Sequence, residues 1–87
     1  MTISVFLADD HAIVRDGLCI ILESQPEIHV VGMVANGREA VLQVRKLKPE
    51  VVVMDISMPE LNGIEATRQI LEENPEISVV ILSMHAS

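Results

Sequence analysis

The sequence predicts an α/β fold, a doubly wound parallel sheet with helices on both faces, and two repeated patterns support this prediction. A polar residue followed by Pro-Glu and an apolar run occurs three times, from Gln25, Lys48 and Asn74. Asn-Gly with a Glu two residues later occurs twice, in the stretches that begin at Ala35 and Leu61. The first pattern ends a helix and begins a strand, and the second begins a helix. Such alternation is typical of a parallel sheet joined by right-handed crossovers.

The strands follow from short apolar runs with clear ends. The run ISVFLA stops at two acids and gives the first strand. Each of the other three runs follows a Pro-Glu pair, is rich in β-branched residues and is too short for a helix. The run VVVM is apolar without interruption, which is typical of a central strand buried on both faces. The predicted strands are Ile3–Ala8, Ile28–Val34, Val51–Met54 and Ile77–Ser83.

The helices lie between these strands. The repeated prolines, at positions 26, 49 and 75, disfavour helical geometry in the preceding residue and mark the ends of helices. Asn36 and Asn62 are suited to cap the second and third helices, because a Glu stands three residues after each in a variant of the capping box. The predicted helices are Ala12–Glu23, Gly37–Leu47 and Gly63–Glu72.

Composition limits the functions that this chain can have. Its 87 residues are enough for one small domain. Thirteen acids against 6 bases give a formal charge of −7, which repels phosphate backbones and argues against direct nucleic-acid binding. The single cysteine, Cys19, offers no disulfide framework, so we expect a reducing, cytoplasmic location. We identify no signal peptide, and no stretch approaches the roughly 20 apolar residues of a membrane span.

Polar residues stand at the predicted ends of three strands. Asp9 and Asp10 follow the first strand, Asp55 follows the third, and Ser83 ends the fourth. In parallel sheets, ligands bind beyond the carboxyl ends of the strands. If the first and third strands are neighbours, three carboxylates meet at one edge, and their repulsion raises at least one pKa unless a cation enters. Such a cluster suits Mg²⁺, which binds carboxylates and retains several waters.

Simpler interpretations exist for each of these residues taken alone. Asp55 fits a helix cap or a solvated turn, and one of the pair Asp9 and Asp10 fits a cap of the first helix. Their joint placement at strand ends favours a metal site, because independent turn acids need not cluster. Zinc is less well suited than magnesium, since neither His11 nor Cys19 stands at metal-ligand spacing from a second soft ligand.

Nucleophilic attack by an aspartate on phosphorus is the chemistry that fits this site. The loop after the first strand is acidic and would oppose a phosphate, and neither a P-loop motif nor a nucleophile-elbow motif occurs. An aspartate can attack phosphorus while Mg²⁺ neutralises the developing charge. Ser57 stands where aspartyl-nucleophile phosphatases place a second Asp, which argues against that class.

Three stretches resemble the receiver domain of bacterial two-component response regulators: ADDHAIVRDGL at 8–18, VVVMDISMPELNGIEA at 51–66 and VVILSMH at 79–85. The resemblance spans the whole chain, residues 1–87, and is strongest to the NarL/FixJ branch, in which a LuxR-type DNA-binding domain follows the receiver. It implies a flavodoxin-like sheet with strand order 2-1-3-4. It also implies a signalling domain rather than an enzyme, with self-catalysed phosphoryl transfer as its only chemistry.

The resemblance further implies a role for each matching residue. Asp55 would accept a phosphoryl group from a histidine of a sensor kinase. Asp10 and Asp55 would bind Mg²⁺ together with the backbone carbonyl of Ser57. Asp9 would contribute to the metal site through water, and Ser83 matches the hydroxyl that contacts the phosphoryl group.

The chain departs from the family pattern at its carboxyl end. A full receiver continues with helix four, strand five and helix five, so we expect these elements to be lacking, together with the lysine that follows strand five and the aromatic residue on it. DNA would be bound only through an effector domain absent from this chain. The helix at 12–23 carries two apolar stripes, which predicts either deep burial against the sheet or a second neighbour, such as the missing helix five or a partner chain.

Two functions follow from the resemblance. In the first, the chain is a phosphoacceptor receiver, which switches dimerisation and transcriptional output in the full-length protein. In the second, it is a phosphorylation-incompetent interaction module that keeps the binding surface without the switch. In both cases we expect self-association, or a domain-swapped dimer, through the edge of the fourth strand or the exposed face of the first helix.

Overall fold

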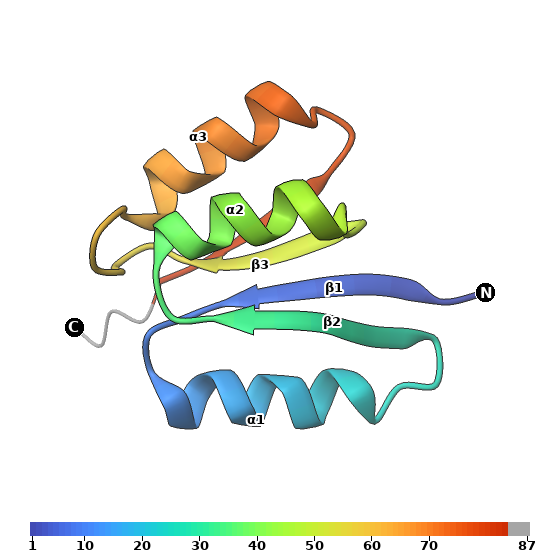
Figure 1. The fold of residues 1–87 in the computed structure, drawn as a ribbon. Coiled ribbons are helices and arrows are strands. Elements are labelled where there is room, and N and C mark those ends of the chain that lie inside the picture. The colour runs from blue at the N-terminus through green and yellow to red at the C-terminus, as the bar shows by residue number, and fades with distance from the viewer. Residues whose placement is uncertain (84–87) are drawn as a thin grey trace.

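The computed structural model describes residues 1–83, which form a four-stranded parallel sheet and three helices (Figure 1). The strands are β1 (Ile3–Ala8), β2 (Ile28–Val34), β3 (Val51–Asp55) and β4 (Ser78–Leu82). The helices are α1 (Ala12–Glu23), α2 (Gly37–Leu47) and α3 (Gly63–Glu73). The strand order is β2-β1-β3-β4 and all neighbours are parallel, which confirms the predicted fold class and strand order.

β3 and α3 each differ from the prediction by one residue at one end, and β4 differs by one residue at both ends. β3 includes Asp55, because Asp55 pairs with Leu82 at the last step of the β3–β4 register. β4 begins one residue late, since the N–H of Ile77 donates to the carbonyl of Asn74 in the preceding turn. Ser83 therefore follows β4 and does not belong to it, and α3 extends by one residue through an N–H donated by Asn74 to Ile70.

Both predicted asparagine caps are present. The side-chain oxygen of Asn36 accepts the N–H of Glu39 at 2.8 Å, and that of Asn62 accepts the N–H of Glu65 at 2.9 Å. These bonds satisfy backbone donors that the first turn of a helix leaves unpaired. The first helix differs, because His11 stands at its N-cap and makes no side-chain capping bond.

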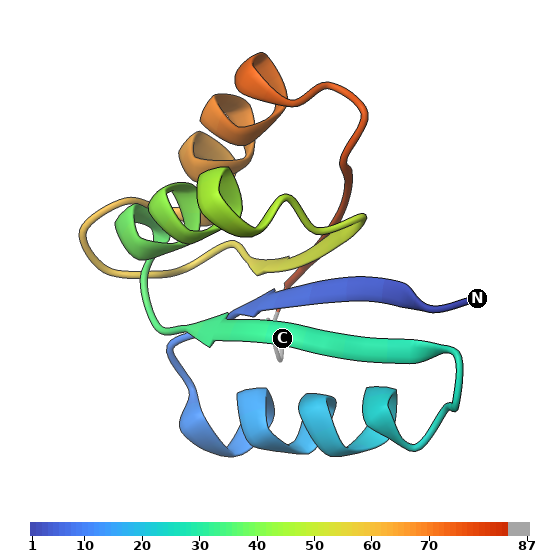
Figure 2. The ribbon, with the colours of Figure 1, turned by 45° about the vertical axis from the view of Figure 1, so that its right-hand side comes forward.

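The helices lie on both faces of the sheet, but they bury their side chains unequally (Figure 2). α2 and α3 pack on each other and on one face, and the core lies between them and the strands. It contains Phe6, Ala8, Ala40, Val41, Val44, Val52, Met54, Met58, Ala66, Ile70 and Ile77. α1 packs on the other face, against β1 and β2. None of the three described helices has the length and apolar character to cross a membrane.

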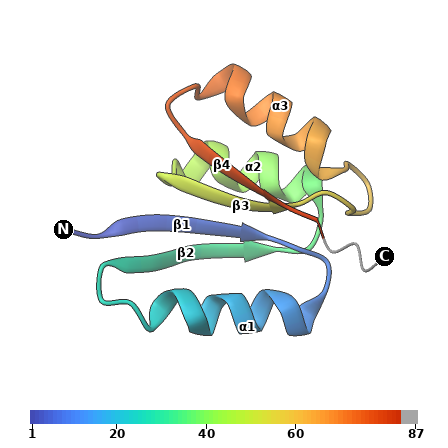
Figure 3. The same cartoon turned by 180° about the vertical axis from the view of Figure 1, so that it is seen from behind.

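No residue of α1 is buried, so the first of the two predicted alternatives, a helix deeply buried against the sheet, is wrong. α1 lies along β1 and β2, and β4 lies at the far edge of the sheet beyond β3 (Figure 3). Within residues 1–83, α1 packs against β1 and β2, and the side of the helix that faces away from these strands is exposed. Its outer residues Ile13 and Ile20 are 88% and 71% exposed.

Candidate phosphoacceptor and metal site at the ends of β1 and β3

The candidate site lies where β1 and β3 end side by side. Ala8 pairs with Met54 in the parallel register, so Asp9 and Asp55, the next residue on each chain, reach the same edge of the sheet. Both carboxyl side chains are buried, and Asp10 beside them is exposed. One ligand atom from each of the three acids and from His11 lies within 4.8 Å of the others. The predicted meeting of the three carboxylates is therefore present.

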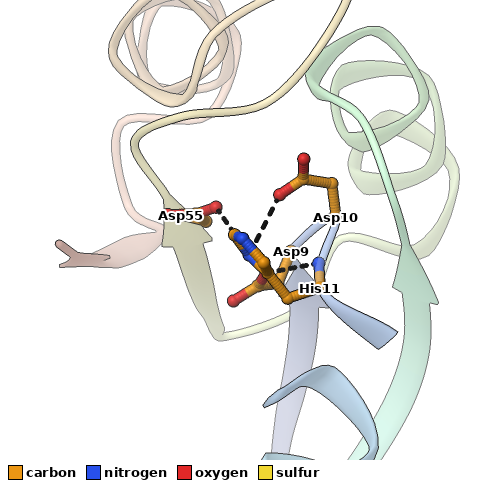
Figure 4. Close-up of side chains that lie close together, drawn as sticks. All are labelled: Asp9, Asp10, His11 and Asp55. Atoms are coloured by element: carbon orange, nitrogen blue, oxygen red, sulfur yellow. Dashed lines mark hydrogen bonds and ion pairs between the residues drawn. The ribbon is translucent and has the colours of Figure 1, made fainter. Parts of the chain in front are cut away.

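The ring of His11 lies among these carboxylates (Figure 4). Its Nδ1 is 2.9 Å from Oδ1 of Asp9, 3.2 Å from Oδ1 of Asp10 and 3.8 Å from Oδ2 of Asp55. The hydrogen bond with Asp9, followed by the negative charge of Asp10, raises the pKa of His11. The backbone N–H of His11 also donates to Oδ1 of Asp9 at 2.8 Å, which holds the turn between β1 and α1.

Sequence reasoning gave His11 no role in this site. Only its position directly after Asp9 and Asp10 could have suggested one. That position does not show the direction of the ring, which depends on the turn that Asp9 closes.

Asp55 carries a charge that its surroundings disfavour. Burial raises the pKa of Asp55, and the negative charges of Asp9 and Asp10 raise it further, whereas the backbone N–H of Ser57 acts in the opposite direction. Within residues 1–83, no Lys or Arg forms an ion pair with the three acids. Arg15 reaches this region, but it donates to the main-chain carbonyl of Asp9, at 3.0 Å.

Two buried oxygen atoms indicate that the residues present fit a divalent cation. Oδ2 of Asp9 and Oδ2 of Asp55 are buried and accept no hydrogen bond from any described residue. Buried polar atoms almost always have a partner, so each exception requires an explanation. Carboxylate oxygens are the ligands that Mg²⁺ and similar ions prefer, so a divalent cation is a suitable partner for such atoms.

The two predicted serine positions flank this edge. Ser57 is exposed and stands two residues after Asp55 in the loop that follows β3. Ser83 is also exposed and comes directly after Leu82, which pairs with Asp55. The roles of the Ser57 carbonyl and the Ser83 hydroxyl stay predictions.

Close backbone packing holds the loop between β3 and α3 against the end of β3. The N–H of Gly63 donates to the carbonyl of Ile56 at 2.8 Å, and a Cβ at position 63 would overlap the carbonyl oxygen of Asp55. Glu60 in this loop has a φ of 68°, in the left-handed region that non-glycine residues rarely adopt. The loop therefore fixes the backbone that carries the Asp55 carboxylate.

The sequence model of the response regulator receiver domain matches residues 5–87. The chain belongs to this family. The receiver is similar to a two-component response regulator of the LuxR family from Aurantimonas sp. SI85-9A1, with a TM-score of 0.92 and 38% identity over 100% of this chain and 62% of that one. It is also similar to the response regulator domain of Thermotoga maritima CheB, with a TM-score of 0.92 and 44% identity over 95% and 61% of the two chains.

The receiver also resembles part of a much longer curated protein. A protein-glutamate methylesterase/protein-glutamine glutaminase from Syntrophomonas wolfei subsp. wolfei is 48% identical over 62 residues, which are 71% of this chain and 18% of that protein. The receiver thus spans less than a fifth of the length of this relative.

Proposed function

We propose that this receiver accepts a phosphoryl group on Asp55 from a histidine of a sensor kinase. The observation that carries the proposal is the unpartnered, buried Oδ2 of Asp55 at the end of β3, beside two further carboxylates. A carboxylate in these surroundings is a poor choice for stability alone, because burying a charge without a partner is costly. This carboxylate is well suited to bond to a phosphoryl group, because the new bond relieves the negative charge on the buried oxygen.

The proposed reaction uses this oxygen as the nucleophile. Oδ2 of Asp55 forms a bond to phosphorus while the bond from phosphorus to the kinase histidine breaks, and that nitrogen keeps the electron pair and takes up a proton. Burial and the neighbouring acids destabilise the ionised carboxylate, which makes it more basic. The loop that packs Gly63 against Asp55 holds the carboxylate in place during the attack.

The acids of this site would also hold Mg²⁺. Asp10 and Asp55 would supply carboxylate oxygens, Ser57 its backbone carbonyl, and Asp9 a contact through water. When bound, the ion supplies positive charge that offsets the negative charge on the transferring group. Ser83, next to Leu82 at the same edge, would donate its hydroxyl to a phosphoryl oxygen.

We propose that phosphorylation switches dimerisation and transcriptional output in the full-length protein. The similarity to a LuxR-family regulator over the whole chain supports this effector and the NarL/FixJ branch. The similarity to part of a protein-glutamate methylesterase/protein-glutamine glutaminase indicates that comparable receivers occur beside other effectors.

Intact-mass measurement after treatment with a small phosphodonor tests the proposed acceptor. With Mg²⁺ present, the wild-type chain should gain one phosphoryl group, and Asp55→Asn should gain none. Asp16→Asn is the matched control, because Asp16 is an exposed acid on α1 outside the cluster, and this variant should be labelled like the wild type. Equal labelling of Asp55→Asn and the wild type would contradict the proposal.

One observation supports a second function. No described Lys or Arg pairs with the acids, so no such cation is present to stabilise a transferred phosphoryl group. In this alternative, the receiver is an interaction module that binds a kinase or another receiver without being phosphorylated. Two results together would distinguish this alternative: the wild type binds a kinase, and its mass does not increase after phosphodonor treatment.

A further inference from the structure

A cleft of about 220 Å³ opens on the surface between α2 and α3, which lie side by side on one face of the sheet (Figure 2). It is lined by Arg38, Val41, Leu42, Arg45, Leu61 and Gln69. We propose that this cleft binds an acidic amphipathic helix of another protein. The inference goes beyond the proposed phosphoryl transfer and does not depend on it, because the cleft shares no residue with the acidic site.

The floor of the cleft is apolar. Val41 is buried, and Leu61 packs against the core. Leu42 is 41% exposed, so part of its side chain is available to a partner. An apolar floor with a few polar groups around it is the usual form of a site that binds a helix or another ligand.

The walls of the cleft are held in place from both helices. A Cβ at Gly37 would overlap the carbonyl oxygen of Leu61, so the start of α2 packs directly on the backbone that carries the Leu61 side chain. Towards the other end, Arg45 on α2 donates two hydrogen bonds to Glu73 on α3. A site that is already formed loses little conformational entropy when a partner binds.

Two arginines give the cleft a positive charge in an acidic protein. Arg38 and Arg45 stand seven residues apart on α2. That spacing is about two helical turns, so both side chains leave the helix on the same side, about 10.5 Å apart along its axis. No acid belongs to the lining, although the formal charge of the chain is −7.

Both guanidinium groups are available to a partner. Nε of Arg38 is 3.7 Å from Oε1 of Glu60, which is too long for a hydrogen bond. Arg45 uses Nε and Nη2 towards Glu73, at 3.1 and 2.9 Å, and a guanidinium has five donors in all. All four side chains are at least 44% exposed, and exposed ion pairs contribute little to stability. Their exchange for carboxylates of a partner therefore costs little.

The spacing of these groups favours a helix as the occupant. On a helix that lies along the cleft, two carboxylates seven residues apart would face both arginines, and an apolar residue between them would contact Leu42. An extended polyanion, such as an anionic membrane surface, would be repelled by the net charge of −7. A short helix differs, because its charge is confined to the cleft.

Fluorescence anisotropy tests the inference with a labelled peptide about 15 residues long, which has leucines on one helical face and glutamates beside them. The wild-type chain should bind this peptide saturably, and added salt should weaken the binding. Arg38→Gln with Arg45→Gln should reduce affinity about tenfold or more. Leu42→Ala, which keeps the charge, should also reduce it. Lys46→Gln with Arg68→Gln is the matched control, because it removes two exposed charges outside the cleft, and it should bind like the wild type.

Three further measurements complete the experiment. Circular dichroism checks that each variant is folded, and a scrambled peptide of the same composition should bind weakly. Sedimentation with phosphatidylglycerol vesicles should leave the chain in solution.

Absence of saturable peptide binding by the wild type would overturn the inference. Equal losses in the arginine pair and in the matched control would also overturn it, since they would indicate attraction by net charge alone. Vesicle binding that requires Arg38 and Arg45 would assign the cleft to a lipid surface instead. A chain mass that falls in the Arg38→Gln, Arg45→Gln variant, without peptide binding by the wild type, would assign it to contact between copies.

Discussion

At Asp55, the proposed function and the stability of the fold make opposite demands. Its carboxylate is buried beside two other acids, and no described Lys or Arg pairs with it. The fold tolerates this charge because apolar packing of β3 and its neighbours, Val52 and Met54 included, stabilises the strand that carries it. The proposed reactivity of Asp55 thus depends on a buried negative charge that destabilises the fold locally.

Asp55→Asn should stabilise the metal-free protein at neutral pH. The amide keeps the shape of the carboxylate without its charge, so the free energy of unfolding should rise by about 1–3 kcal/mol. Urea unfolding in the presence of a chelator measures this gain.

The gain in stability from Asp55→Asn should depend on pH, and the raised pKa of Asp55 fixes the direction of this dependence. Because the pKa of Asp55 is raised in the folded protein, the destabilisation is absent below the pKa of the unfolded chain. It grows as the pH rises and is complete above the folded pKa. Urea midpoints of the two proteins should therefore converge in acid, and a constant difference across the pH series would contradict this explanation.

The sequence predicted the acids of the site but not the histidine. Asp9, Asp10 and Asp55 were predictable because the carboxyl ends of adjacent parallel strands share one edge, whatever the side-chain rotamers are. The position of the His11 ring depends on a local turn, in which Asp9 accepts the backbone N–H of His11. No pattern of residue types contains that information.

At the scale of elements, local signals placed the helices well and the strand ends less well. Asn36 and Asn62 begin α2 and α3 as predicted, because an N-cap acts only on the turn that follows it. The ends of β4 depend on its register with β3, a contact between distant parts of the chain. The burial of α1 was not predictable either, since it depends on which elements lie beside the helix.

Gly63→Ala should destabilise the protein because β3 and the start of α3 approach closely. The new methyl group would overlap the backbone carbonyl oxygen of Asp55, which cannot move without shifting the strand. Overpacking of this kind costs about 1–3 kcal/mol. A lower urea midpoint together with slower labelling of Asp55 by a phosphodonor is the expected result.

Gly17→Ala is the matched control for this substitution. A Cβ at Gly17 meets nothing within 4 Å, and the residue lies inside α1. Alanine there should raise stability by about 0.5–1 kcal/mol, because glycine is the weaker helix former. Equal destabilisation by both substitutions would show that the close approach at Gly63 is not the cause.

At the scale of the whole molecule, the two faces of the sheet are unequally covered. α2 and α3 enclose the core on one face, while α1 on the other leaves Ile13, Ile20 and Ile21 exposed. Val80 on β4 is 48% exposed at the edge of the sheet. Apolar surface of this kind favours association with another surface.

The chain should therefore self-associate in solution at tens of micromolar. Light scattering should show a mass above that of one chain, and added salt should increase it, because copies with a charge of −7 repel each other. The double substitution Ile13→Lys with Ile20→Lys should give monomers if the α1 face is used. Leu42→Lys on α2, where Leu42 is 41% exposed, is the control and should leave the mass unchanged.

Monomeric wild-type protein at these concentrations would contradict the prediction of self-association. If Leu42→Lys lowers the mass as much as the double substitution on α1 does, the contact is not specific to the outer face of α1.

Anomalous diffraction from crystals grown with Mn²⁺ tests the central claim most directly, because Mn²⁺ can replace Mg²⁺ at carboxylate sites. We predict one strong peak among Asp9, Asp10 and Asp55, within about 2.2 Å of carboxylate oxygens of Asp10 and Asp55. A peak elsewhere on the acidic surface, with none at the ends of β1 and β3, would contradict the assignment of these residues as a shared metal and phosphoacceptor site.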